Sequence, residues 1–144
     1  MNKRRAPAQD VMWSLLQAAG AVEDRLEQAL AGVGLSGAKL AALTQLVEAD
    51  EPISLSELAA QCACVRSNIT QLVDRLEAEK LVRRIDDPKD RRSLRAVITP
   101  LGRERQAAGA KKVEVVRKQL AAALKAIDGE ALQRALSGLA VSKP

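Results

Sequence analysis

The feature that most constrains the fold is a change in the spacing of apolar residues just after Lys80. Before this point, apolar residues recur every three or four positions, as they do on one face of an amphipathic helix. Residues 82–85 and 94–98 instead alternate loosely, and a charged segment at residues 86–90 separates them. Two short alternating runs around a polar loop predict a β-hairpin set among helices.

Helices are predicted on both sides of this hairpin from apolar spacing and from capping residues. The expected helices cover residues 8–32, 37–49, 55–62, 65–79 and 100–127, with a last one after Asp128. Residues whose side-chain oxygens can accept backbone N–H groups stand before four of them: Ser36, Ser54, Thr99 and Asp128. Glu57 follows Ser54 by three positions, which completes a capping-box pattern.

Composition indicates one helical domain with an aliphatic core. The chain has 144 residues, of which 47% are hydrophobic, and it contains no Tyr or Phe. Its apolar residues are mostly Ala, Leu and Val, and Ala and Leu favour helix. We therefore predict a mainly α fold with a small antiparallel β-hairpin, formed by residues 1–144 as a single domain. No apolar run is long enough to span a membrane, and we expect a cytoplasmic protein.

Positive charge concentrates around the predicted hairpin. The formal net charge of the chain is +5. One short stretch holds a large share of the basic residues: Lys80, Arg83, Arg84, Lys89, Arg91, Arg92 and Arg95. A local basic cluster is typical of a nucleic-acid-binding surface, although a charged hairpin taken by itself is more often only solvated.

The helix predicted over residues 65–79 presents a polar face that suits the edges of bases. Residues expected to point away from the core or to flank that face are Ser67, Asn68, Thr70, Gln71, Asp74 and Arg75. The short helix before it and the tight connection between them give the order of a helix-turn-helix, whose second helix enters a major groove. Arginines of the following hairpin can then reach the minor groove beside it, where a narrow groove favours Arg.

Two runs of sequence resemble the MarR family of winged helix-turn-helix transcriptional regulators. Residues 66–77, RSNITQLVDRLE, followed by LVRR at residues 81–84, are similar to the family's recognition helix and first wing strand. Residues 87–93, DPKDRRS, and the exit TPLG at residues 99–102 resemble its wing and the start of its long dimerisation helix. Weaker similarity in helix lengths and pattern covers nearly the whole chain.

The resemblance implies a homodimeric regulator that binds double-stranded DNA, acts as a repressor at a palindromic operator and is released by a small ligand. Residues 8–32 and 100–142 would form the dimerisation helices, and residues 35–99 the DNA-binding lobe. It also implies that Asp90 braces the wing by orienting an arginine, while Arg91 or Arg92 enters the minor groove.

The residues expected to contact DNA belong to two elements. Those of the recognition helix are Arg66, Ser67, Asn68, Thr70, Gln71 and Arg75, and those of the wing are Lys89, Asp90, Arg91 and Arg92. Family members usually have a capping residue where this chain has Val65, so we expect the helix to begin one or two residues later, at Ser67.

Other functions find less support. Trp13 is the single aromatic residue that could line a ligand pocket. Cys62 and Cys64 fall at apolar positions, which favours core packing over the alternative of a redox-sensing regulator. Two Cys without any His cannot complete a zinc site, and the absence of His and of a Gly-rich phosphate loop argues against an enzyme or a cofactor. An architectural or protein-interaction module built on a winged helix is the remaining alternative.

Overall fold

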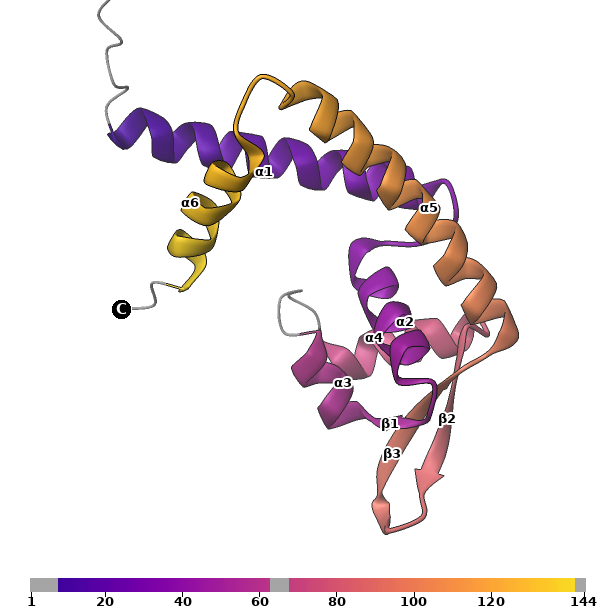
Figure 1. The fold of residues 1–144 in the computed structure, drawn as a ribbon. Helices are drawn as coiled ribbons and strands as arrows, with labels where there is room; N and C mark the ends of the chain where they lie inside the picture. The colour runs from indigo at the N-terminus through magenta and orange to yellow at the C-terminus, as the bar shows by residue number, and fades with distance from the viewer. Residues whose placement is uncertain (1–7, 63–67, 142–144) are drawn as a thin grey trace, which may run out of the picture.

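A computed structural model describes residues 8–62 and 68–141 of the chain. Its elements, in chain order, are α1 (Ala8–Ala31), α2 (Gly37–Ala49), β1 (Ile53–Ser54), α3 (Leu55–Gln61), α4 (Ile69–Ala78), β2 (Val82–Asp87), β3 (Asp90–Ile98), α5 (Pro100–Ala123) and α6 (Gly129–Val141). The predicted fold class is confirmed: the chain is mainly helical with a small antiparallel sheet. In Figure 1, α2 to β3 gather into a lobe, while α1, the far half of α5 and α6 form an arch beside it.

The caps expected from the sequence set the starts of four helices. Their oxygens accept as follows: Ser36 Oγ from Lys39 N at 3.2 Å, Ser54 Oγ from Glu57 N at 3.1 Å, Thr99 Oγ1 from Gly102 N at 3.0 Å, and Asp128 Oδ1 from Glu130 N at 3.1 Å. The Glu57 carboxylate accepts from Gln61 Nε2 at 3.5 Å, one turn further along α3. The serine half of the predicted capping box is therefore present.

The sheet has the strand order β1-β3-β2, and both pairings are antiparallel. Ile53 of β1 pairs with Ala96, and Val82 of β2 pairs with Ile98, so β3 lies in the centre. The sequence predicted β2 and β3 but not β1, because a strand of 2 residues is too short to show alternation. The expected loop at residues 86–90 was too long, since β2 continues to Asp87 and β3 already begins at Asp90.

The core of the lobe is aliphatic, as the composition predicted. Its largest fully buried side chains come from α1 to β2: Leu30, Leu43, Leu46, Leu58, Leu76, Leu81, Val73 and Val82. Leu72, Val73 and Leu76 form the inner stripe of α4, which fixes the opposite face of this helix toward solvent. Burial on one side of α4 therefore determines which of its side chains are free to contact another molecule.

The junction between β3 and α5 is held by close backbone packing. Thr99 Oγ1 donates to Lys80 O, at 2.7 Å, besides capping α5. A Cβ on Gly102 would lie 2.1 Å from Leu81 O, so only glycine fits there. The Thr-x-x-Gly exit thus fixes how α5 leaves the lobe.

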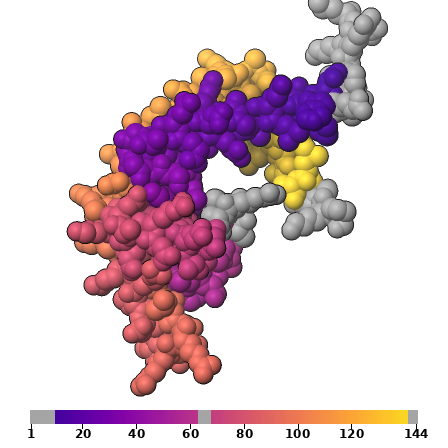
Figure 2. All heavy atoms as spheres, turned by 180° about the vertical axis from the view of Figure 1, so that it is seen from behind, coloured from indigo at the N-terminus to yellow at the C-terminus, as the bar shows by residue number. Residues whose placement is uncertain are grey.

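Apolar side chains lie exposed on the arch. The large ones are Val11, Met12, Trp13 and Leu16 of α1, Val115 and Leu120 of α5, Ile127 between the last two helices, and Leu136 and Leu139 of α6. Figure 2 shows an open hollow between α1 and α6 on one side and the lobe on the other. In the described part of the chain, no helix combines the length and apolarity needed to cross a membrane.

Candidate nucleic-acid interface

The outer face of α4 is the first component of the candidate interface. Thr70, Gln71, Asp74 and Arg75 are exposed on the side opposite the buried stripe, as the periodicity predicted. Hydroxyl, amide and guanidinium groups on one exposed helical face can donate to and accept from base edges.

Asn68 begins this helix as its N-cap. Its Oδ1 accepts from Thr70 N at 3.1 Å and from Gln71 N at 3.4 Å. The expectation that the helix runs from Val65, or begins at Ser67, was wrong, because α4 begins at Ile69 after this cap. Asn68 therefore has a capping function that the sequence analysis missed. Arg66, Ser67 and Cys64 lie outside the described residues.

The tip of the β2–β3 hairpin is the second component. Lys89, Asp90, Arg91 and Arg92 are all exposed there, and Figure 1 shows the hairpin extending well beyond the lobe. Asp87 Oδ1 accepts from Lys89 N at 2.9 Å, and this bond, helped by the nearby Arg95 guanidinium, holds the pKa of Asp87 below its usual value. The turn is thus shaped by an ionised Asp at neutral pH.

Asp90 braces the hairpin tip, but through different contacts from those implied by the family resemblance. Its Oδ1 accepts from Arg92 N at 2.9 Å, and its Oδ2 accepts from Ser93 Oγ at 3.0 Å. Among the ion pairs of the described residues, none includes Arg91 or Arg92. The carboxylate therefore fixes the backbone that carries the arginines, and it does not orient a guanidinium.

Arg84 connects the hairpin to α4, a contact that the sequence analysis did not identify. Its Nη2 lies 2.5 Å from Asp74 Oδ1 and 3.1 Å from Glu77 Oε1, while its backbone N donates to Glu77 Oε2 at 2.8 Å. The backbone bond first, and then the guanidinium, lower the pKa of Glu77. The signal was available: Arg84 stands two positions after buried Val82, so both side chains lie on the same face of β2.

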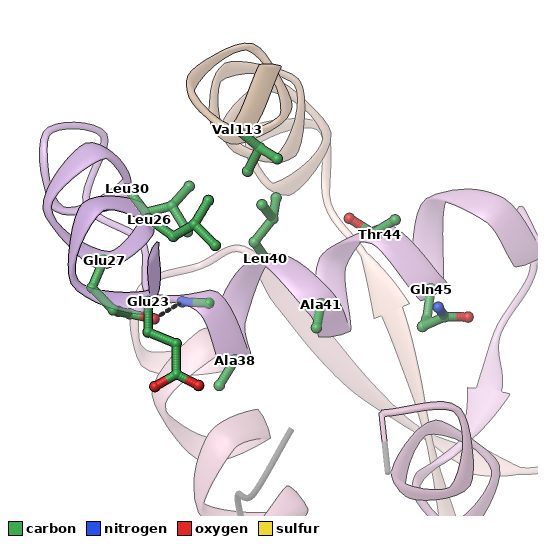
Figure 3. Close-up of a pocket in the computed structure, with 11 residues that line it drawn as sticks. Glu23, Leu26, Glu27, Leu30, Ala38, Leu40, Ala41, Thr44, Gln45 and Val113 are labelled. Carbon is green, nitrogen blue, oxygen red and sulfur yellow. Dashed lines mark hydrogen bonds between the residues drawn. The ribbon is translucent and has the colours of Figure 1, made fainter. Parts of the chain in front are cut away.

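A pocket of about 750 Å³ lies between α1, α2 and α5. Leu26, Leu30, Leu40 and Val113 form its apolar wall, and Figure 3 shows them converging from the three helices. Trp13, the residue proposed from the sequence, does not line this pocket and is 60% exposed on α1.

Cys62 is the one cysteine among the described residues. Cys62 is 4% exposed and belongs to the core cluster, which agrees with the packing interpretation. Because Cys64 lies outside the described residues, the redox alternative stays a prediction. No group of three His, Cys, Asp or Glu side chains within the described ranges could hold a metal ion.

An exposed polar helix that follows α3 and lies beside a basic hairpin defines the lobe as a winged helix-turn-helix, the DNA-binding fold of many transcriptional regulators. The chain belongs to the MarR family of these regulators. The MarR family model matches residues 33–93, which cover both components of the interface.

Solved structures of transcriptional regulators are similar over nearly the whole chain. The transcriptional repressor CouR, bound to a 23-mer DNA duplex, is 28% identical, with a TM-score of 0.77 over 89% of this chain and 90% of that one. Sco3205, a MarR family regulator from Streptomyces coelicolor in complex with DNA, is 29% identical, with a TM-score of 0.77 over 94% and 87%. BldR from Sulfolobus solfataricus is 30% identical, with a TM-score of 0.66 over 96% and 97%. No curated protein sequence matched the chain.

Proposed function

We propose that this DNA-binding regulator is a homodimeric repressor of a palindromic operator. Each subunit would place the outer face of α4 in a major groove and its hairpin tip in the adjacent minor groove. The observation that carries the proposal is that the outer face of α4 and the hairpin tip are both exposed, while Arg91 and Arg92 lie outside the ion pairs of the described residues. The DNA complexes of CouR and Sco3205 support it.

The two surfaces would read DNA differently. Gln71 suits bidentate contact with an adenine edge and Arg75 suits a guanine, while Thr70 can contact either base type. Arg66 and Ser67 are assigned to the same surface from the sequence alone. Lys89, Arg91 and Arg92 would contact phosphates and the minor groove, where they add affinity with little direct sequence information.

The proposed dimerisation region comprises residues 8–32 and 100–142, which include the arch, and residues 35–99 would form the DNA-binding lobe. α6 has 13 residues, and an isolated helix of that length is marginal in water unless its apolar side packs against a partner. Leu136 and Leu139 of this helix are exposed, as are Trp13 and Leu16 of α1. A second copy of the chain would cover these residues, and a two-fold dimer requires a palindromic site.

The last part of the proposal is that the protein represses transcription and that a small ligand releases it from the operator. CouR, which shares the fold of this chain, is a transcriptional repressor. The pocket lies where α1 and α5 meet α2 of the lobe. A ligand bound there would change the spacing between the DNA-binding lobes of the two subunits.

Footprinting of the full-length protein on the DNA upstream of its own gene tests this function. A discrete protected palindrome, with half-sites about one helical turn apart, is the expected result. Uniform coating of the DNA would instead indicate an architectural protein. Reporter expression from the protected promoter, with and without the protein, then distinguishes repression from activation.

A further inference from the structure

Asp74 lies near the centre of the exposed face of α4. An α-helix turns by about 100° per residue, so the direction opposite the buried stripe of α4 falls closest to Ala78, Asp74 and Gln71. Thr70 and Arg75 lie further to either side. The Asp74 side chain is 53% exposed. Asp74 therefore faces the expected position of the base edges as directly as Gln71 does, although the sequence analysis did not include it among the DNA contacts.

Arg84 holds this carboxylate from the side of β2. Its Nη2 lies 2.5 Å from Asp74 Oδ1 and 3.1 Å from Glu77 Oε1. The backbone N of Arg84 also donates to Glu77 Oε2 at 2.8 Å, so both its backbone and its side chain are bound to α4. Charge-assisted contacts of this kind orient the groups that make them. Asp74 is thus held in place before DNA binds, and Arg84 offsets a negative charge that phosphates would otherwise repel.

The second oxygen of the Asp74 carboxylate is open to a further donor. Within residues 8–62 and 68–141, Arg84 is the residue that contacts Asp74, and the ion pair uses Oδ1. Oδ2 can therefore accept another hydrogen bond. In the major groove, the edge of cytosine presents the N4 amino donor, whereas guanine and thymine present acceptors, which repel a carboxylate. Adenine also has an amino donor, but its N7 acceptor lies beside it. A carboxylate at this place therefore favours cytosine.

We propose that Asp74 recognises a cytosine in each operator half-site, with Oδ2 accepting from the N4 amino group, and that Arg84 is the positioning residue which holds the carboxylate. This role rests on the proposed function, because it assigns one base to a recognition helix that the proposed function places in the major groove. It also connects the two components of the interface. A residue of the hairpin sets the orientation of a base-reading side chain on α4.

The experiment selects an operator for the full-length protein from random-sequence duplexes and then measures Kd, by fluorescence anisotropy, for all four bases at each half-site position. At one position we expect the wild type to prefer cytosine by about fivefold or more. Asp74→Asn should change the preference at that position to adenine, because an amide pairs with adenine N6 and N7. Asp74→Ala should bring the four bases there to within about twofold of one another.

Arg84→Gln tests the positioning role. It should reduce the preference for cytosine about threefold at the same position, the effect of losing one partly exposed ion pair, and leave the preferences elsewhere in the half-site unchanged. If Arg84 only joined the strand to the helix, the variant would weaken binding to every duplex by the same factor, and its positioning role would be refuted.

Asp86→Asn is the matched control, because it removes the same charge from an exposed position of β2 and should leave every base preference unchanged. Asp74 has no part in base recognition if the wild type prefers cytosine at no position, or if both Asp74 variants keep the wild-type preferences. A discrete operator with unaltered preferences in those variants would contradict the role of Asp74 alone. Failure of the wild type to select any discrete operator would instead contradict the proposed function.

Discussion

At the scale of single residues, Asp90 is the most informative position of the hairpin. Its carboxylate accepts from Arg92 N and Ser93 Oγ, yet it also places a negative charge where DNA is expected. We predict that Asp90→Ala weakens DNA binding about three- to tenfold, because lost hydrogen bonds of about 1 kcal/mol each release the backbone that carries the arginines. Fluorescence anisotropy on one operator duplex measures this.

Asp90→Asn is the matched control for that prediction. Asparagine keeps an oxygen for Arg92 N and an amide that can bond to Ser93 Oγ, but it removes the charge. We expect its affinity to equal or exceed that of the wild type. Tighter binding by Asp90→Ala as well would show that the brace has no effect on DNA binding and that the hairpin acts as a simple electrostatic patch.

A second prediction at this scale separates base reading from phosphate contact. Gln71→Ala should change which base is preferred at one operator position, by about 1–3 kcal/mol of discrimination. Arg91→Ala should instead weaken binding to operator and scrambled duplex alike and reduce the slope of log K against log salt by about 0.9. A salt series on both duplexes measures the two effects, and unchanged binding by both variants would rule out the proposed interface.

The residues that were predicted correctly from the sequence are those whose partners are close along the chain. Ser36, Thr99 and Asp128 cap helices through backbone groups two or three positions away, so their roles follow from local pattern. Asn68 was assigned to base contact because it precedes a polar face, although the same side chain is a strong N-cap. Predicting the ion pair between Arg84 and Asp74 requires knowing that β2 packs beside α4, and periodicity alone does not show this packing.

At the scale of elements, the link between α4 and β2 sets the position of the hairpin relative to the recognition helix. Glu77 of α4 accepts from the backbone N of Arg84 and from its guanidinium. These contacts lower the pKa of Glu77, so they contribute stability above the ordinary glutamate pKa of about 4.3 and lose it as the pH falls through the lower folded value. The hairpin should therefore loosen in acid before the core does.

We predict that Glu77→Gln lowers the melting temperature at pH 7 and that this difference shrinks as the pH is lowered from 7 into the acid range, because the wild-type carboxylate loses its charge there. Thermal unfolding followed by circular dichroism across that pH range measures it. Glu104→Gln, an exposed α5 variant outside the ion pairs of the described residues, serves as the control and should follow the wild type. If the difference in melting temperature between Glu77→Gln and the wild type stayed constant with pH, the charge of Glu77 would not stabilise the position of the hairpin.

At the scale of the whole molecule, the arch and the lobe differ in how completely one chain can stabilise them. The lobe buries a leucine-rich core, to which α1 of the arch adds Leu30, and α5 is fixed to the lobe by the close approach of Gly102 to Leu81 O. The arch leaves apolar side chains exposed on α1 and α6. In the sequence analysis, this division followed from the family resemblance, and no pattern in one chain could place the second subunit that would cover these side chains.

The dimer itself gives the last prediction. Leu136→Glu combined with Leu139→Glu puts two charges on the exposed apolar side of α6, and burying them in an interface would be strongly unfavourable. We expect monomers in sedimentation experiments and a loss of operator affinity of at least tenfold, because one lobe reaches only one half-site. Gln133→Glu, a matched charge on the exposed surface of the same helix, should remain dimeric. If the double variant stayed dimeric and bound the operator normally, α6 would lie outside the interface, and the assignment of residues 100–142 to dimerisation would be wrong.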